Sequence, residues 1–317
     1  RQSIEALPSI LASVPSFRVP ITSSPYANQE IQSLVSIFND LDYSTSFFHG
    51  APNGSMGFLG LSNILGFDNY FGKNEFNNNS LYDGYWGIWD EPFLGFMKMK
   101  IDKFEEPFFT TFFSLTSHEP FKIPLEYKDT FPVGNVPMHQ VIGYSDNALK
   151  EFFNSSKNEP WFKNTLFVIT ADHCNQFWYP FYRNGINRFA IPIIFYHPNN
   201  SFTGVNDKLS QHLDIFPSII DLVGYNKPIN TWGRSLFSEN SDKPFSIHFS
   251  GTVYHFSMNK FTLIFDGDNV IGVYKIDDYE LNENLINDDQ IDYSFEEQYL
   301  KAFFQDYMER IIDGKLN

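Results

Sequence analysis

The segment Thr165-Leu166-Phe167-Val168-Ile169-Thr170-Ala171-Asp172-His173 decides the fold, because an apolar run rich in β-branched residues ends there in two adjacent metal-binding side chains. Such a run predicts a buried strand with Asp172 and His173 at its carboxyl end. Open α/β sheets place their sites at that end of their strands. A carboxylate beside an imidazole suits a divalent cation such as Mn²⁺, Mg²⁺ or Zn²⁺. The structural alternative is an Asp that caps the next segment and a His that only packs.

Strands and helices alternate on both sides of this segment. Further apolar strands are predicted at 43–49, 107–115 and 191–196, and helices at 3–11, 29–38, 141–153 and 213–223. This order predicts an α/β fold with a largely parallel central sheet flanked by helices. Residues 51–60 and 67–91 are rich in Gly, Asn and aromatic residues, and we expect them to be loops near a site.

The C-terminal part has a different pattern. Four short alternating runs, at 245–249, 253–257, 261–265 and 270–276, predict a small antiparallel sheet. An amphipathic helix at 295–312 closes the chain. The predicted domains are therefore a catalytic α/β core at 1–240 and a small antiparallel subdomain with a terminal helix at 241–317.

Composition narrows the classes of function. A chain of 317 residues can bury a full core, and 36 Phe residues should fill much of it. The formal net charge of −16 argues against a surface for nucleic acid or for an anionic membrane. No apolar run is long enough to span a membrane. Because the chain starts at Arg1, we expect it to be a processed or excised piece of a longer protein.

The only cysteine is Cys174, which follows His173 directly. A single cysteine excludes an intramolecular disulfide, and it leaves the compartment undecided. A nucleophilic thiolate is one interpretation of its position. A small residue that fills the turn after the strand is the interpretation favoured by the absence of an orienting His and Asn nearby.

Three histidines, His49, His118 and His173, end three separate apolar strands. The carboxyl ends of parallel strands meet at one edge of a sheet, so the spacing favours a shared polar site. His212 precedes a helix with Asp214 and is expected to be structural. The remaining histidines have no comparable context and are expected to be structural or on the surface: His139, His197, His248 and His255.

Five segments occur in the order seen in the lipoteichoic acid synthase branch of the sulfatase and alkaline phosphatase superfamily. They are Phe47–Gly50, Trp86–Phe93, Phe113–Phe121, Asn164–His173 and Gln211–Pro217, and Gly233–Phe237 is similar to the family's segment before its small C-terminal sheet. The resemblance covers about three quarters of the chain. It implies an alkaline phosphatase/sulfatase-like sandwich and an enzyme of that superfamily.

The resemblance also implies roles for individual residues. Ser3 looks like the nucleophile, and Ser3, Asp172 and His173 look like ligands of one divalent metal, with Mn²⁺ favoured over Mg²⁺ or Zn²⁺. His49 and His118 look like substrate-binding histidines, and His118 would also protonate the leaving group. A cap of the first helix is the structural alternative for Ser3, and a helix N-terminus is compatible with both roles.

Two departures from the family matter. Its acidic metal ligand after the first strand should lie upstream of Arg1, so the core is expected to be truncated at its N-terminus and this fragment to be incomplete as a catalyst. Where lipoteichoic acid synthases have an aromatic residue and an arginine beyond the His-Gly motif, this chain has Asn53-Gly54-Ser55-Met56-Gly57-Phe58. Arg183 and Arg188 are alternative phosphate-binding residues.

The resulting hypothesis is a metal-dependent transferase of phosphoglycerol, or a related phospho-alcohol, to an envelope glycan or lipid through a covalent phospho-Ser intermediate. The alternatives are a sulfatase or phosphodiesterase, or a degenerate binding domain without turnover. Ser3-Ile4-Glu5-Ala6-Leu7 lacks the Cys/Ser-x-Pro-x-Arg pattern of sulfatases that form formylglycine. The expected partners are a phospholipid or glycan substrate. The expected location is extracytoplasmic, periplasmic or at the bacterial cell surface, with the parent protein held by an N-terminal membrane anchor.

Overall fold

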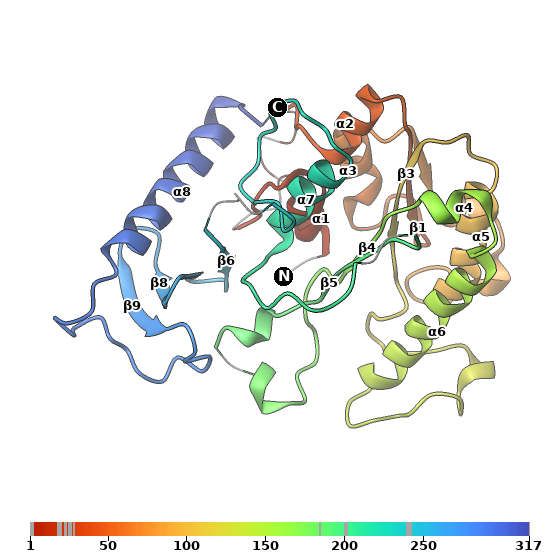
Figure 1. Cartoon of the computed structure of the whole chain (residues 1–317). Coiled ribbons are helices and arrows are strands. Elements are labelled where there is room, and N and C mark those ends of the chain that lie inside the picture. The colour runs from red at the N-terminus through yellow and green to blue at the C-terminus, as the bar shows by residue number, and fades with distance from the viewer. Residues whose placement is uncertain are drawn as a thin grey trace. The chain divides into compact units, whose positions relative to one another are not determined.

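The chain divides into two units, each assembled from separate stretches of sequence. A computed structural model describes residues 3–17, 21, 24, 27, 29–183, 185–199, 202–238 and 243–316 (Figure 1). Unit 1 consists of Arg1–Leu34, Ala171–Pro192 and Gly204–Asn317, and unit 2 consists of Val35–Thr170 and Ile193–Thr203. The division therefore falls beside Asp172, and it differs from the boundary at residue 240, which stays a prediction.

Unit 2 contains the parallel sheet that the sequence predicts. Its strands run in the order β2 (Asn69–Phe71), β1 (Ser44–His49) and β3 (Phe108–Phe113), and both pairings are parallel. Every residue of β1 after Ser44 is buried, as expected for a central strand covered on both faces. His49 ends β1 opposite Phe113, which ends β3.

The strand that precedes Asp172 pairs differently from the prediction. β4 (Phe167–Thr170) and β5 (Ile193–Tyr196) form an antiparallel pair, with Phe167 opposite Tyr196. Their residues are half-buried in β4 and alternate between half-buried and exposed in β5. A strand covered on one face alternates in this way, so the expectation of a fully buried, parallel strand was wrong for this pair.

The helices of unit 2 correct the sequence analysis in two places. Residues 51–60 were expected to be a loop, but α3 begins at Phe58 and buries residues at helical spacing. Within 67–91 the structure has the short strand β2 as well as short helices, and α5 (Asp90–Ile101) begins at its end. The remaining helices of this part of the chain are α2 (Leu34–Asp40), η3 (Ser55–Gly57), α3 (Phe58–Leu65), α4 (Lys73–Phe76), η4 (Asn79–Leu81), η5 (Leu125–Tyr127), α6 (Met138–Ser156) and η6 (Pro160–Asn164).

The predicted helix at 29–38 starts later than expected, at Leu34, because Ile31 instead forms a parallel bridge with Leu316. Helices α5 and α6 pack on a core rich in aromatic rings, in which Phe93, Phe152 and Trp161 are buried. The abundance of Phe in the sequence thus fills the core as predicted.

Unit 1 contains the predicted C-terminal sheet and closing helix. Strands β6 (Phe245–Phe249), β7 (Tyr254–Met258), β8 (Phe261–Phe265) and β9 (Val270–Lys275) pair antiparallel in that order. Helix α8 (Ser294–Asp313) packs on this sheet through Phe304, whose ring lies 4.4 Å from that of Tyr254 and 5.2 Å from that of Phe265.

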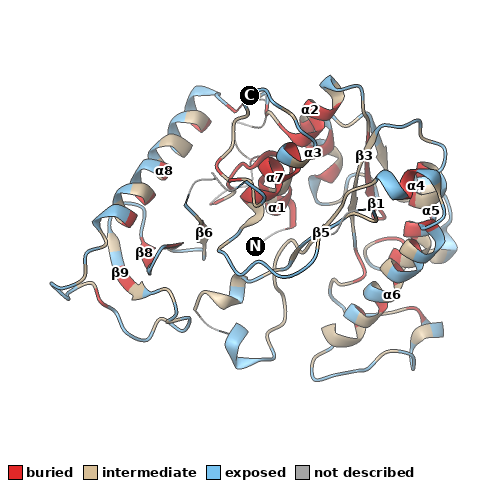
Figure 2. Ribbon diagram, in the orientation of Figure 1, coloured by how far each residue is buried: buried red, intermediate tan, exposed pale blue. Residues whose placement is uncertain are grey.

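The other elements of unit 1 are η1 (Ser3–Glu5), α1 (Ala6–Ala12), η7 (Pro180–Tyr182), η8 (Asn187–Phe189), η9 (His212–Asp214) and α7 (Ile215–Leu222). Helices α1 and α7 are almost entirely buried and contact each other (Figure 2). None of the helices that the structure describes has both the length and the apolar character of a membrane-crossing segment.

Candidate active site

Asp172 and His173 follow the last residue of β4 after only one residue, Ala171. The backbone N–H of His173 donates to Asp172 Oδ1 at 2.8 Å, and His173 Nε2 lies 3.4 Å from Asp172 Oδ2. The side chains of His173 and Asp172 are 31% and 23% exposed, so both reach solvent without being fully solvated. The pair is therefore held together and remains accessible to a ligand.

The donor atoms of this pair fit one divalent cation. Two ligand atoms about 2.1 Å from a cation and separated by a near-tetrahedral angle lie about 3.4 Å apart, which is the observed distance between His173 Nε2 and Asp172 Oδ2. His173 Nδ1 lies 2.8 Å from the carbonyl oxygen of Cys174 and must donate to it. With Nδ1 as the donor, a neutral ring would present its Nε2 lone pair to a metal.

Neighbouring residues fix the turn that carries the pair. His212 Nε2 lies 2.8 Å from the carbonyl oxygen of Ala171, which agrees with the structural role expected for His212. The Cys174 thiol donates to the carbonyl oxygen of Ala190 at 2.8 Å. Burial and the negative charge of Asp172 raise the pKa of the Cys174 thiol. A thiol with a raised pKa is a poor nucleophile, which favours the packing role for Cys174.

Ser3 and Arg183 lie in the same unit as Asp172 and His173. Ser3 is buried at the start of η1, and Arg183 is exposed at the end of η7. Within the described part of the chain, no hydrogen bond joins the Ser3 hydroxyl to the Asp172–His173 pair, and no group of three or more His, Cys, Asp or Glu side chains could hold a metal. The roles of Ser3 and Arg183 therefore stay predictions.

His49 lies in unit 2 and is fully buried. Its ring lies 4.5 Å from that of Phe58 and 5.5 Å from that of Phe113, and Nδ1 lies 3.0 Å from the Phe113 carbonyl oxygen. Burial lowers the pKa of His49 to about 4, against the opposing effect of that hydrogen bond. The neutral ring uses its one N–H for Phe113, so it has no proton to offer a phosphate oxygen in this arrangement. The substrate role of His49 stays a prediction.

His118 is half-buried in the segment that follows β3. Its ring lies 4.2 Å from the ring of Trp86, and its Nδ1 lies 3.2 Å from the carbonyl oxygen of Glu119. The indole N–H of Trp86 donates to the same carbonyl oxygen. Trp86 therefore orients the His118 ring while leaving part of it accessible. The proton-transfer role of His118 itself is untested.

Asp90 is a positioning residue that the sequence analysis did not assign. It is 3% exposed, and its two carboxylate oxygens accept the backbone N–H groups of Leu115 at 2.8 Å and Thr116 at 3.0 Å. Its own N–H donates to Thr116 Oγ1 at 3.1 Å. Asp90 thus ties the start of α5 to the segment that carries His118. Burial raises the pKa of Asp90 to about 6 despite these hydrogen bonds.

A similar structural aspartate joins two of the family-like segments in unit 1. Asp214 is 1% exposed, accepts the backbone N–H of Arg234 at 3.0 Å and also accepts that of Gln211 at 3.0 Å. Leu236 N donates to Ser218 Oγ at 2.9 Å. Hydrogen bonds therefore hold the Gln211–Pro217 and Gly233–Phe237 segments to each other.

The segment Asn53–Phe58, which lacks the family's arginine, is bonded to Glu75 through Asn53. Asn53 donates to both carboxylate oxygens of Glu75 at 3.0 Å, and Glu75 also accepts the N–H of Gly72 at 2.7 Å. An acidic side chain is thus fixed beside this segment, which does not suit a phosphate there. In unit 1, the Arg188 guanidinium lies over the rings of Phe177 at 5.9 Å and Phe189 at 5.3 Å.

The fold is shared with solved structures of the alkaline phosphatase superfamily. A protein of that superfamily from Vibrio parahaemolyticus is similar with a TM-score of 0.82 and 17% identity, over 98% of this chain and 76% of that chain. The lipoteichoic acid synthase LtaP from Listeria monocytogenes is similar with a TM-score of 0.76 and 17% identity, over 98% of this chain and 80% of that chain. The predicted alkaline phosphatase/sulfatase-like fold is confirmed.

The sequence comparisons give the family. The profile of the sulfatase family matches residues 2–225, and the chain belongs to that family. Lipoteichoic acid synthase 1 of Bacillus subtilis (strain 168) is 26% identical over 234 residues, 67% of this chain and 36% of that protein. The lipoteichoic acid synthase-like protein YvgJ of the same strain is 27% identical over 137 residues, 42% of this chain and 22% of that protein. The predicted likeness to lipoteichoic acid synthases is confirmed, although the alignments span only about a fifth to about a third of these relatives.

Proposed function

We propose that the chain carries the catalytic domain of a metal-dependent transferase, which moves phosphoglycerol or a related phospho-alcohol to an envelope glycan or lipid. The observation that carries the proposal is the 3.4 Å separation of Asp172 Oδ2 and His173 Nε2, with Nδ1 committed to Cys174. The similarity to lipoteichoic acid synthases supports a phosphate diester as substrate. Proteins of this superfamily generally use a divalent metal.

In this proposal Asp172 and His173 hold the cation, and Ser3 supplies the nucleophile. When bound there, a divalent cation would neutralise charge on the phosphate and lower the pKa of a nearby hydroxyl. The Ser3 hydroxyl loses its proton to solvent, and its oxygen forms a bond to phosphorus as the bond from phosphorus to the leaving alcohol breaks. In its doubly protonated form, with Nδ1 still donating to Glu119 O, His118 gives its Nε2 proton to the leaving oxygen. In the second step Nε2 takes a proton from the acceptor alcohol, whose oxygen bonds to phosphorus as the bond from phosphorus to Ser3 breaks. Trp86 and Asp90 hold the His118 segment in place for both transfers.

The molecule that attacks the phospho-Ser intermediate decides whether the enzyme is a transferase or a hydrolase. Water in the second step would give a phosphodiesterase, and an alcohol would give the transferase, with the same residues in the same roles. The sequence beginning at Ser3 lacks the formylglycine pattern, which disfavours a sulfatase of that kind. The membrane-anchored, extracytoplasmic location predicted from the resemblance belongs to the same proposal.

The covalent step gives the test. The protein is mixed with Mn²⁺ and a phosphoglycerol diester, quenched with acid, and studied by intact-mass spectrometry and peptide mapping. We expect an adduct on the peptide that contains Ser3, and none in Ser3→Ala. Ser9→Ala is the matched control, because it removes another hydroxyl of the same helical segment, one that donates to Val14 O at 2.9 Å.

The assay is run on this chain and, where the gene encodes residues upstream of Arg1, on the longer protein. An adduct on a different residue, or turnover without an adduct in the longer protein, would overturn the assignment of Ser3. Addition of glycerol or a glycolipid acceptor then distinguishes transfer from hydrolysis by the product formed.

A further inference from the structure

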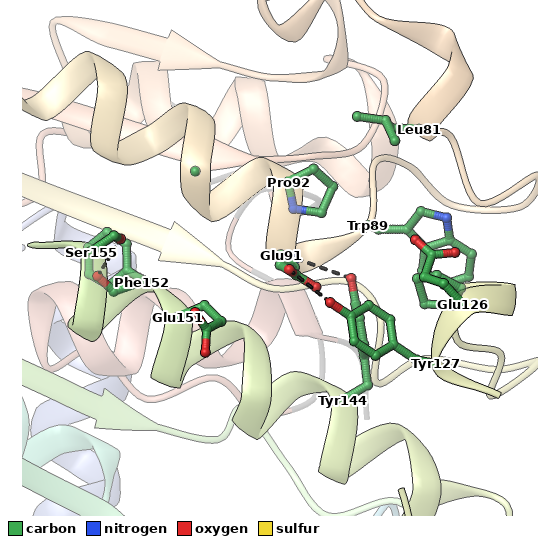
Figure 3. A pocket seen from close by; sticks show the side chains of 12 residues that line it. Leu81, Trp89, Glu91, Pro92, Glu126, Tyr127, Tyr144, Glu151, Phe152 and Ser155 are labelled. Carbon is green, nitrogen blue, oxygen red and sulfur yellow. Dashed lines mark hydrogen bonds between the residues drawn. The ribbon is translucent and has the colours of Figure 1, made fainter. Parts of the chain in front are cut away.

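A cavity of about 400 Å³ lies within unit 2, between α5, η5 and α6 (Figure 3). None of the residues that line it has a chemical role in the proposed reaction. Its lining combines aromatic rings, prolines and carboxylates: Leu81, Trp89, Glu91, Pro92, Gly95, Pro124, Glu126, Tyr127, Tyr144, Glu151, Phe152 and Ser155. The volume is in the range of pockets that bind small molecules.

Helical spacing places the lining residues on facing sides of α5 and α6. Glu91 and Gly95 are four residues apart on α5, and Tyr144, Glu151 and Ser155 recur at helical spacing on α6. A Cβ at Gly95 would have no other atom within 4 Å, apart from the chain next to it. Packing therefore does not require glycine there, although glycine is unfavourable inside a helix. The absence of a side chain at Gly95 leaves more space in the cavity.

The charge of the lining has one sign. Glu91, Glu126 and Glu151 contribute carboxylates, and none of the described residues that line the cavity is Lys, Arg or His. The Tyr127 hydroxyl donates to Glu91 Oε1 at 3.0 Å, as Figure 3 shows. This bond, burial and the charges of the nearby glutamates raise the pKa of Tyr127 to about 12. The charged side chains of the lining are therefore all acidic, with Glu91 half-buried and Glu126 and Glu151 exposed.

Aromatic rings form the other walls, and they are inclined to one another. The ring of Tyr144 lies 6.2 Å from that of Trp89 at 78° and 5.4 Å from that of Tyr127 at 59°. The Tyr144 hydroxyl is fixed by the backbone N–H of Glu91 at 3.3 Å. Tyr144 is fully buried and packs behind the half-buried rings of Trp89 and Tyr127, which are the rings that can face a guest. Proteins bind quaternary ammonium groups through such aromatic faces.

We propose that this cavity binds a small organic ammonium ion, with Trp89 and Tyr127 around the cationic head and Glu91 as the principal counter-charge. A bare metal ion is disfavoured, because the glutamates do not form a metal-holding group among the described residues. The large, weakly hydrated head of an ammonium ion matches aromatic walls better than a strongly hydrated metal does. The proposal is independent of the transferase reaction.

Choline tests the proposal, with 3,3-dimethylbutan-1-ol as its uncharged analogue. Isothermal titration calorimetry on the whole chain should show saturable choline binding and at least about tenfold weaker binding of the neutral analogue. Glu91→Gln should weaken choline binding about tenfold, since it removes the charge and keeps an acceptor for Tyr127. Glu105→Gln is the matched control, because it removes an exposed carboxylate of the same unit outside the cavity.

Gly95→Leu provides a variant that should fold at least as well as the wild type. Leucine favours the helix more than glycine does, so the melting temperature should stay or rise while the added side chain fills the cavity and abolishes choline binding. Ethanolamine and spermidine then show whether the site prefers a methylated, a primary or a longer amine. Equal binding of choline and its neutral analogue, equal losses in Glu91→Gln and Glu105→Gln, or unchanged binding in Gly95→Leu would each overturn the proposal.

Discussion

Asp90 and Asp172 both lie in segments that resemble lipoteichoic acid synthases, but they differ in what surrounds them. Asp90 is 3% exposed and commits both carboxylate oxygens to backbone N–H groups. Asp172 has a side chain that is 23% exposed, and its Oδ2 faces the free nitrogen of His173. The same residue type thus holds a loop in one unit and keeps a partly exposed carboxylate oxygen in the other. Burial and hydrogen-bond commitments separate the two roles where a sequence motif does not.

The histidines differ in the same manner. His49 is buried against Phe58 and Phe113 with a lowered pKa, while His173 is accessible beside a carboxylate. A neutral, enclosed ring stabilises the fold only while it stays uncharged. An accessible ring with a free Nε2 can bind a cation.

The largest expected effect concerns Asp172. Asp172→Asn removes the charge that we propose holds the cation, and we expect turnover of a phosphodiester to fall by about 10³-fold. Because the side chain is partly exposed, the free energy of unfolding should change by less than about 0.5 kcal/mol. Steady-state kinetics with Mn²⁺ and urea unfolding measure the two quantities. Activity that persists in this variant would remove the metal-binding role of Asp172.

A second prediction separates the histidines by pH. The pKa of His49 is lowered from 6.5 to about 4, so its contribution to stability is present above pH 6.5 and is lost as the pH falls through 4. The free energy of unfolding should fall by about 3 kcal/mol when this contribution is fully lost. Asp90 acts with the opposite sign, because its pKa is raised from 3.8 to about 6 and its contribution is lost as the pH rises through 6.

His49→Gln isolates the first of these effects. The stability difference between this variant and the wild type should shrink by about 3 kcal/mol between pH 7 and the acid limit. Urea unfolding at a series of pH values provides the measurement. A difference that is the same at every pH would show that His49 is not a buried neutral ring.

The smallest expected effect concerns Asp90. Asp90→Ala leaves the buried N–H groups of Leu115 and Thr116 without acceptors, and we expect the free energy of unfolding to fall by about 2 kcal/mol. The control is Asp129→Ala, which removes an exposed carboxylate and should have little effect. Equal stability of both variants would argue against Asp90 as the residue that fixes the His118 segment.

Much of the fold followed from the sequence, because the strong patterns were local. The apolar run before His49 and the alternating runs at 245–276 predicted strands that the structure contains. Helix α3 was missed because Gly54, Gly57 and Gly60 hide its apolar spacing. The antiparallel pairing of β4 with β5 could not be predicted, since strand direction depends on the connection between them and not on residue type.

The candidate site was predictable only where adjacent residues act together. Asp172 and His173 are neighbours in sequence, so their pairing followed from the strand that precedes them. The role of Asp90 depends on backbone groups 25 and 26 residues away, which no local pattern reveals. The Trp-Asp-Glu-Pro segment did carry a signal, since it belonged to the resemblance, but its meaning required the hydrogen bonds.

The central claim is that Asp172 and His173 hold one divalent cation. Anomalous diffraction at the manganese edge, from crystals grown with Mn²⁺, tests it most directly. We predict a single strong peak bonded to Asp172 Oδ2 and His173 Nε2, which is lost in crystals of Asp172→Asn. A manganese peak on other residues, with this pair left without metal, would contradict the claim.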